Sequence, residues 1–523
     1  MNILLTQFEK QEALESVMGQ LSDLNWLNRF LSETPGDNEV GGRSRQVPNA
    51  CWSRVLPTPS PNPKLCLWSQ EVGDDLGLDR GDGDILGGGE PVEGMDPYAQ
   101  RYGGHQFGNW AGQLGDGRAI TLGEVKTSNG VIELQLKGSG QTPYSRFSDG
   151  KAVLRSSIRE FLCSEAMYHL GVPTTRALSL VTTGEQVMRD MLYDGNKKLE
   201  PGAIVCRVAP SFIRLGSFQI HAMMGDKATL EAIVKHTLAH HFSECEFNEK
   251  GIIKWARIVA KSTAKMIADW MRVGFVHGVM NTDNMSIHGL TIDYGPYGWL
   301  EDYNPGWTPN TTDAGRRRYR YGAQPQIGAW NIARFLEAIS PLIEETDRLT
   351  DVLGFYISTY EEEINQVWVN KLGLDQFKDG DGDLISELNE LLQQVETDMT
   401  IFFRELCNLE YPDVENLTYA FYDSESIPKE DWNSWLNKWW SRVEASPNRE
   451  VMLKTNPKYV LRNWMAQLAI DAAEEGDFSI CEKLHIMLKK PYSEQSEFEV
   501  EWYKKRPKWA QNRVGCSMLS CSS

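Results

Sequence analysis

The sequence predicts an α+β fold, with strands in the first half of the chain and helices in the second. Residues 131–140 alternate apolar and polar side chains with the period of two that is typical of a strand. Residues 151–171 carry apolar side chains at helical spacing. Helical periodicity also dominates from about 228 to 272 and again after Trp330. A run of strands followed by a run of helices is typical of α+β proteins.

The first ninety-five residues predict a helix and an extended arm. Residues 2–32 have apolar positions near helical spacing, which are Phe8, Leu14, Val17, Met18, Leu21 and Leu24. Residues 33–64 are rich in Pro, Gly and Asn, so we expect them to cross the surface in extended form. Residues 79–94 are a loop by composition, and 204–218 predict another strand and turn.

Composition excludes several classes of function. The 523 residues include 17 tryptophans and are 41% hydrophobic, which indicates a globular protein with a large core. The net charge of −19 argues against a nucleic-acid partner, because phosphate-backbone binding needs a concentrated basic surface. The sequence contains no run of eighteen apolar residues, so it predicts no membrane span.

The N-terminus and the cysteines predict a cytoplasmic protein. The first residues carry Glu9, Glu12 and Glu15 and lack the basic and apolar regions of a secretory signal. Nine cysteines contain no Cys-x-x-Cys pair, which in a chain of this length is typical of reduced intracellular thiols.

The segment from His277 to Tyr303 predicts a magnesium site. Asp283 and Asn284 are followed by an apolar stretch and Asp293, so a loop and a short strand can bring these oxygens into one cleft. Counted from His277, Asn284 and Asp293-Tyr294-Gly295 match the metal-binding positions of the protein-kinase signature. The catalytic Asp of that signature falls on Val279, which cannot accept a proton.

Lys137 and Glu160 extend the kinase pattern. In kinases a strand lysine pairs with a glutamate on the following helix, and these two residues have that context and spacing. Either residue alone fits a solvated surface better, but together with the downstream metal segment they favour the pair. We therefore expect a protein-kinase-like bilobal fold with an N-terminal arm and a helical C-terminal extension. The expected units are 1–95, 96–225 (N-lobe), 226–410 (C-lobe) and 411–523.

The glycine-dense stretch 101–118 has two interpretations. Glycines let backbone N–H groups approach phosphates, and Arg118 adds charge, but the stretch does not match Gly-x-Gly-x-x-Gly and a tight hairpin explains it equally well. Arg207 and Arg214 lie among apolar neighbours, so each needs an anion. Structural salt bridges are the simpler explanation, and a bound phosphate is the alternative.

Two further patterns suggest other metals. His236, His240, His241 and Cys245 have spacing that suits zinc, although a polar helix end is the simpler explanation. Residues 379–390 resemble a calcium loop, but Leu384 occupies the position that needs Gly, which favours a turn and a helix start.

Long strings of this sequence closely resemble the selenoprotein O family. They are YGGHQFGNWAGQLGDGRA, QLKGSGQTPYSRFSDGKAVLRSSIREFLCSEAMYHLGVPTTRALSL, HGVMNTDNMSIHGLTIDYGPYG and the ending SCSS, and the likeness runs from about residue 45 to 523. The resemblance implies a kinase-like protein without the usual catalytic Asp. It also implies transfer of AMP from ATP to Ser, Thr or Tyr hydroxyls of proteins, with ATP held in reverse compared with kinases.

The resemblance also implies roles for individual residues. Asp283 would accept the proton, although a carboxylate beside a metal ligand is expected to have a low pKa. Asn284 and Asp293 would hold Mg²⁺, with Mn²⁺ possible, and Glu160 would orient Lys137. The ATP site would be formed by Gly115, Gly117, Arg118, Lys137, Asp149, Gly150, Arg207, Arg214 and Asp293.

Cys521 stands where some members of the family carry selenocysteine. Relatives with a partner thiol carry it at the position of Pro309, so no regulatory disulfide is expected here. Protein adenylylation is the favoured function. A conventional protein kinase, in which Asp283 replaces the missing base, and a nucleotide-binding pseudokinase scaffold are the alternatives.

Overall fold

A large antiparallel sheet forms one half of the protein. The computed structural model describes residues 19–81 and 83–520. Within these, the main path of the sheet follows the order β2-β4-β7-β8-β11-β10-β3, while β1 pairs with β7 and β9 with β11. Its strands are β1 (Trp26–Leu27), β2 (Trp52–Arg54), β3 (Lys64–Trp68), β4 (Tyr98–Gln100), β7 (Ala119–Thr127), β8 (Gly130–Lys137), β9 (Ala152–Val153), β10 (Arg176–Arg189) and β11 (Lys198–Ala209).

The predicted strand and helix at the centre of this half are both present. The segment 131–140 forms β8, and 151–171 forms α5 (Leu154–His169), which contacts β10 and β11. Apolar side chains spaced along α5, such as Ile158, Phe161 and Leu162, are fully buried. The helix ends before Gly171, whose φ of +73° is costly for other residues.

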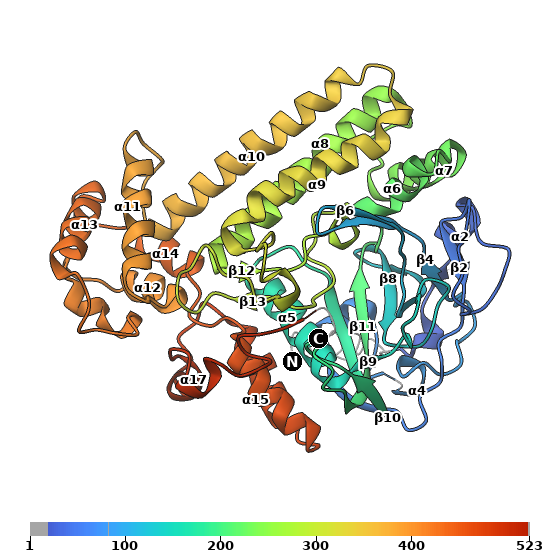
Figure 1. The fold of residues 1–523 in the computed structure, drawn as a ribbon, viewed down its shortest axis with the longest axis horizontal. Helices are drawn as coiled ribbons and strands as arrows, with labels where there is room; N and C mark the ends of the chain where they lie inside the picture. Colours follow the sequence, from blue (N-terminus) through green and yellow to red (C-terminus); the bar gives the residue numbers. More distant parts are fainter. Residues whose placement is uncertain (1–18, 82, 521–523) are drawn as a thin grey trace, which may run out of the picture.

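Helices form the other half (Figure 1). The long helices α8 and α10 contact each other, and both contact α9. These and the preceding short helices are α6 (Leu215–Met223), α7 (Lys227–His241), α8 (Glu249–Val273), α9 (Gln324–Ile339) and α10 (Asp347–Leu372). The predicted α+β class is therefore confirmed in its coarse form, a large antiparallel sheet followed by many helices.

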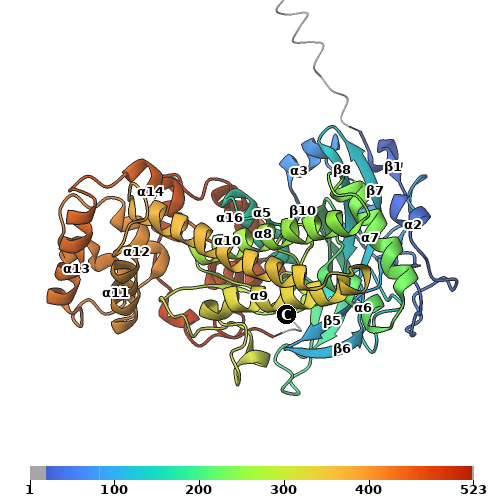
Figure 2. The same ribbon diagram turned by 90° about the horizontal axis from the view of Figure 1, so that it is seen from above.

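The last 150 residues contribute to both ends of the molecule. Helices α11 to α14 lie far from the sheet, whereas α15 and α16 return to pack against α5 (Figures 1 and 2). Their bounds are α11 (Asp381–Gln394), α12 (Met399–Leu406), α13 (Lys429–Arg442), α14 (Arg449–Thr455), α15 (Asn463–Glu474), α16 (Ser479–Leu488) and α17 (Ser496–Trp502). The turn and helix start expected near 379–390 are confirmed by the start of α11.

The segment that carries the predicted magnesium ligands is mostly irregular. It runs from β12 (Phe275–Val276) through a 3₁₀ turn at Thr282–Asn284 to β13 (Gly298–Trp299). The short strand expected between Asn284 and Asp293 is absent in this described segment, where Thr291 makes only isolated bridges to Thr174 and Met285.

Two predictions for the N-terminal region are wrong where the structure describes it. The helix predicted over 2–32 begins in residues 1–18, which lie outside the described part. Its remainder breaks into a 3₁₀ turn (Leu21–Asp23), β1 and α2 (Arg29–Glu33), because Trp26 and Leu27 pair with Val125 and Glu124 of β7. The loop predicted over 79–94 contains a short helix, α4 (Gly83–Leu86). Among the described helices, none is long and apolar enough to cross a membrane.

Candidate active site

Asp293 is the centre of a cluster of buried charges. Arg207 Nη1 lies 2.6 Å from its Oδ1, and Arg214 Nη1 lies 2.5 Å from its Oδ2. Lys137 Nζ is 4.0 Å from Oδ1. Burial alone would raise the pKa of Asp293, but Arg214, Arg207 and Lys137 hold it well below its usual value. Three cations therefore share one ionised carboxylate.

The predicted pair of Lys137 and Glu160 is present. Lys137 Nζ lies 2.6 Å from Glu160 Oε2, and Arg207 Nη1 lies 3.2 Å from Oε1. Lys137 is the last residue of β8 and Glu160 lies in the second turn of α5, so the pair ties the strand end to the helix. Burial lowers the pKa of Lys137 and Glu160 raises it, with a net lowering.

Arg207 is positioned by the strand that pairs with β8. It stands opposite Gln135 in the register of β11 and β8, and its Nη2 donates a hydrogen bond to Gln135 Oε1. Gln135 is buried and was not among the predicted site residues. Gln135 is two residues before Lys137 and therefore on the same face of the strand, which was the signal that could have identified it.

Arg214 joins the two ends of the predicted metal segment. Its Nη1 donates to the main-chain oxygen of Asp283 over 2.8 Å as well as to Asp293, and its guanidinium lies 4.3 Å from the centre of the Tyr102 ring. Asp116, between the predicted Gly115 and Gly117, lies 3.8 Å from Arg214 and is buried. Burial raises the pKa of Asp116, and sequence reasoning missed this residue.

Asp283 is a buried carboxyl group at the edge of this cluster. Gln106 Nε2 donates to its Oδ2 over 3.2 Å, while Oδ1 has no hydrogen-bond partner among the described residues. Burial raises the pKa of Asp283 to about 6, and the hydrogen bond from Gln106 opposes that rise. Desolvation thus outweighs the effect of the neighbouring cations on the pKa of Asp283, while the low pKa expected beside a bound metal ion stays a prediction.

The first part of the glycine-dense stretch is a hairpin that lies against Asp283. It consists of β5 (Gly103–Gln106) and β6 (Asn109–Gln113), and the backbone N–H of His105 donates to Thr282 Oγ1 over 2.8 Å. A Cβ at Gly104 would lie 2.4 Å from Asp283 Oδ1, so glycine is needed for this approach. The tight-hairpin interpretation therefore holds for β5 and β6.

Gly115, Gly117 and Arg118 follow the hairpin and lead into β7. A Cβ at Gly115, whose φ is +142°, would lie 2.4 Å from the Tyr144 ring, and one at Gly117 would lie 3.0 Å from the Tyr144 oxygen. The main-chain oxygen of Arg118 accepts a hydrogen bond from Gly138, directly after Lys137. These three residues thus lie beside the strand end that carries Lys137.

Asp149 and Gly150 lie in the loop before β9. Asp149 is partly exposed and pairs with Arg189 over 2.7 Å. Gly150 has φ of +71°, and a Cβ there would lie 2.1 Å from the Gly140 oxygen. No hydrogen bond or ion pair within the described residues links Asp149 to Asp293, so the structure does not join it directly to the charge cluster.

The oxygen atoms around Asp293 fit a magnesium ion. Asn284 Nδ2 donates to the main-chain oxygen of Val279 over 3.0 Å, which leaves its Oδ1 as the ligand atom. Together with Asp293, whose two oxygens also accept from Arg207 and Arg214, this provides the few hard oxygens that Mg²⁺ takes from proteins beside phosphate. Asp293 has φ of +57°, a backbone conformation uncommon outside glycine that is typical of functional sites. Val279 is buried and has no acid–base group.

Comparison with known proteins identifies the family. A profile described as protein adenylyltransferase SelO matches residues 39–489. The chain belongs to this family. A protein nucleotidyltransferase YdiU of Aromatoleum aromaticum is 53% identical over 517 residues, covering 95% of this chain and 99% of the relative. One of the same name from Flavobacterium johnsoniae is 50% identical, covering 96% of this chain and 100% of the relative. The predictions of this family and of a nucleotidyltransferase are confirmed.

The end of the SelO-family chain reaches the segment after the site. Leu519 forms backbone hydrogen bonds with Pro309 and Thr311, of 3.1 and 2.7 Å. Cys521 lies outside the described residues, and the eight cysteines within the described part are free thiols.

Proposed function

We propose that this protein transfers AMP from ATP to Ser, Thr or Tyr hydroxyls of other proteins, with pyrophosphate leaving. The observation that carries the proposal is the convergence of Lys137, Arg207 and Arg214 on the single carboxylate of Asp293, next to the buried Asp283. Glu160 and Asp116 balance part of the charge of these cations, and guanidinium and ammonium groups are the side chains that bind the phosphates of ligands such as ATP.

In the proposed site, the cations hold the phosphate chain. Arg207 and Arg214 present planar guanidinium groups that bind phosphate oxygens through paired N–H donors, and Glu160 keeps Lys137 turned toward the same point. Asn284 and Asp293 would hold Mg²⁺ or Mn²⁺, which when bound would neutralise charge on the phosphates. Gly115, Gly117 and Arg118 would approach the nucleotide from the β7 side, and Asp149 and Gly150 from the loop before β9.

Asp283 receives the proton in this proposal. The substrate hydroxyl oxygen bonds to the α-phosphorus, the bond from that phosphorus to the bridging oxygen of the β-phosphate breaks, and the electron pair leaves with pyrophosphate. The hydroxyl proton passes to Asp283 Oδ1, the atom without another partner. Burial, which raises the pKa of Asp283 to about 6, supports this role, because a general base is most effective when its pKa lies near the working pH.

We also propose that the architecture is kinase-like and bilobal. Support comes from the strand lysine paired with a helix glutamate, and from the metal segment that follows the helices α6 to α8. The proposed units remain an arm at 1–95, an N-lobe at 96–225, a C-lobe at 226–410 and an extension at 411–523. The extension also contacts the N-lobe, because α15 and α16 pack against α5.

Labelled ATP tests the proposed reaction. The protein is incubated with Mg²⁺, a mixture of cellular proteins and ATP labelled on either the α- or the γ-phosphate. Protein-bound α-label with an equal release of pyrophosphate is expected. Transfer of γ-label alone would instead show a conventional kinase, and transfer of neither label would favour a pseudokinase scaffold.

A further inference from the structure

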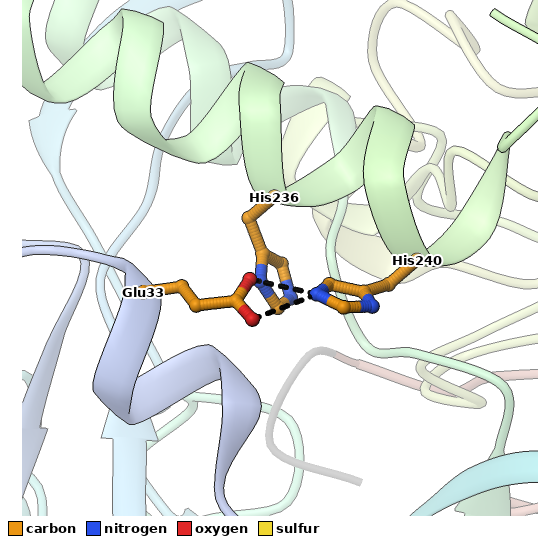
Figure 3. A group of neighbouring side chains, drawn as sticks. All are labelled: Glu33, His236 and His240. Atoms are coloured by element: carbon orange, nitrogen blue, oxygen red, sulfur yellow. Dashed lines mark hydrogen bonds and ion pairs between the residues drawn. The ribbon is translucent and has the colours of Figure 1, made fainter.

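A second group of metal-ligating side chains lies between the N-terminal arm and the helical half. Glu33, the last residue of α2, faces His236 and His240 on α7 (Figure 3). One atom, Glu33 Oε2, lies 2.8 Å from His236 Nδ1 and 2.7 Å from His240 Nε2. All three ligand atoms lie within 4.8 Å of one another. This group shares no residue with the Asp293 cluster.

The structure changes the ligand set that the sequence suggested. His236 and His240 are four residues apart and therefore lie on one face of α7. His241 instead faces His288, with ring centres 5.2 Å apart, and Cys245 is not part of the group. The third ligand is a carboxylate about two hundred residues earlier in the chain. The simpler explanation, a polar helix end, does not account for the carboxylate of Glu33 between the two histidines.

We propose that Glu33, His236 and His240 bind a divalent transition-metal ion, with Zn²⁺ as the best fit. Two imidazole nitrogens and one carboxylate oxygen form a donor set that zinc takes in proteins. Ligand atoms on a tetrahedral zinc ion are about 3.3 Å apart, given bonds of about 2.0 Å. Each of the two histidine nitrogens therefore needs to move only about half an ångström away from Glu33 Oε2 to reach this spacing.

The surroundings leave a position for a further ligand. The side chain of Glu33 is 41% exposed and that of His240 is 21% exposed, whereas His236 is buried. Glu33 and His236 line a surface groove together with Ala228, Glu231, Ala232, Lys235 and Ala239. A water molecule from this groove can complete the coordination, so the ion can exchange with solution.

The protons in the cluster define what the metal must displace. The Glu33 carboxylate only accepts hydrogen bonds, so His236 Nδ1 carries the proton that faces it. Arg29 Nη1 lies 3.0 Å from His240 Nδ1, and a guanidinium only donates, so Nδ1 accepts and His240 carries on Nε2 the proton that faces Glu33. Zinc takes the place of both protons, and each ring then carries its proton on the other nitrogen.

Arg29 must release His240 for this exchange. Its guanidinium stays bound to Glu124, at 2.7 Å from Nη2 to Oε1, when the Nη1 contact is lost. The bound ion would connect α2 to α7 through coordination bonds and so hold the N-terminal arm on the helical half.

Zinc titration of the full-length protein tests the site. Wild type, Glu33→Gln, His240→Asn and the control Glu231→Gln are titrated with Zn²⁺ against a chromophoric chelator, after circular dichroism has shown that each is folded. The Asp293 cluster and the thiols are the same in all four proteins, so their binding cancels in the comparison. Glu231 lines the same groove without belonging to the cluster, and it serves as the matched control.

Wild type and Glu231→Gln should each bind one equivalent of zinc at this site. Glu33→Gln and His240→Asn should bind that equivalent at least about tenfold more weakly. Equal zinc binding by all four proteins would overturn the proposal. The absence of any zinc site in wild type would also overturn it, and Glu33, His236 and His240 would then form hydrogen bonds only. Co²⁺ gives a second readout that needs no variant. Visible d–d absorption in wild type that Zn²⁺ abolishes supports the site, and its absence argues against it.

Discussion

Two clusters of buried charge in this protein are centred on opposite charges. Around Asp293, two guanidinium groups and one ammonium group share one carboxylate, and the side chain of Asp293 is 20% exposed. Around Arg462, two carboxylates share one guanidinium. Arg462 Nη1 lies 2.5 Å from Glu301 and 2.7 Å from Asp398, whose side chain is 0% exposed.

The difference separates a binding site from a structural element. In the Arg462 cluster the guanidinium makes a bidentate contact with Asp398, and Tyr422 adds a hydrogen bond to the same carboxylate, so the charges are closed off from solvent. In the Asp293 cluster Glu160 also pairs with Lys137 and Arg207, and the side chains of Asp293 and Lys137 are 20% and 10% exposed. Burial of charge alone therefore does not indicate a binding site, whereas a cluster of cations that reaches solvent is suited to bind an anionic ligand.

Asp293→Ala should have the largest effect on activity. It removes the carboxylate that orients three cations and the proposed metal ligand, so transfer of α-label should fall by about 100-fold or more. The measurement is protein-bound label at saturating ATP. Circular dichroism and thermal unfolding should show a folded protein, and a folded variant with full activity would contradict the central role of Asp293.

Arg462→Met should lower stability without changing the reaction. It leaves Glu301 and Asp398 buried without their cation, and we expect unfolding in denaturant to become easier by about 3–5 kcal/mol. Arg54→Met is the control, because Arg54 pairs with Asp96 on the surface and should cost at most about 1 kcal/mol. Loss of α-label transfer per folded molecule of the Arg462 variant would remove the distinction between the clusters.

Lys137→Ala should weaken the binding of ATP. Loss of one charged contact to phosphate is worth about 1.5–3 kcal/mol, which corresponds to an increase of about tenfold or more in Kd. Titration with a fluorescent ATP analogue measures the change. Glu160→Gln should have a smaller effect, because Arg207 still contacts position 160 and the lysine remains. Equal ATP affinity and equal turnover in Lys137→Ala and wild type would exclude the lysine from the site.

The buried carboxylate of Glu165 is a reference outside both clusters, and the effect of replacing it should depend on pH. Burial would raise the pKa of Glu165, but hydrogen bonds from Arg176 and Ser69 lower it overall. A lowered folded-state pKa contributes stability above the unfolded pKa, and that stability is lost as pH falls through the folded pKa. Glu165→Gln should therefore cost about 1–2 kcal/mol near pH 7 and less near pH 3, measured by denaturant unfolding. A cost that grows on acidification would refute this assignment.

Local sequence patterns determined much of the protein. The alternation over 131–140 and the helical spacing over 151–171 depend on side chains a few positions apart, so β8 and α5 were predictable. The order of residues along one segment gave the base and metal ligands proposed here, which are Asp283, Asn284 and Asp293, and the long matching strings identified the SelO family. The N-terminal helix failed because pairing with β7 outweighed the local pattern at Trp26 and Leu27.

Only the tertiary structure decided which charges meet. Asp116 reaches Arg214 from the segment before β7, and Gln106 reaches Asp283 from the β5–β6 hairpin, contacts that no local pattern reveals. The raised pKa of Asp283 depends on its burial in the folded protein. Glu33 joins His236 and His240 across about two hundred residues for the same reason. The periodicity of apolar residues depends on side chains that are close along the chain. Ion pairs and hydrogen bonds in the two sites depend on contacts that form only when distant segments pack together.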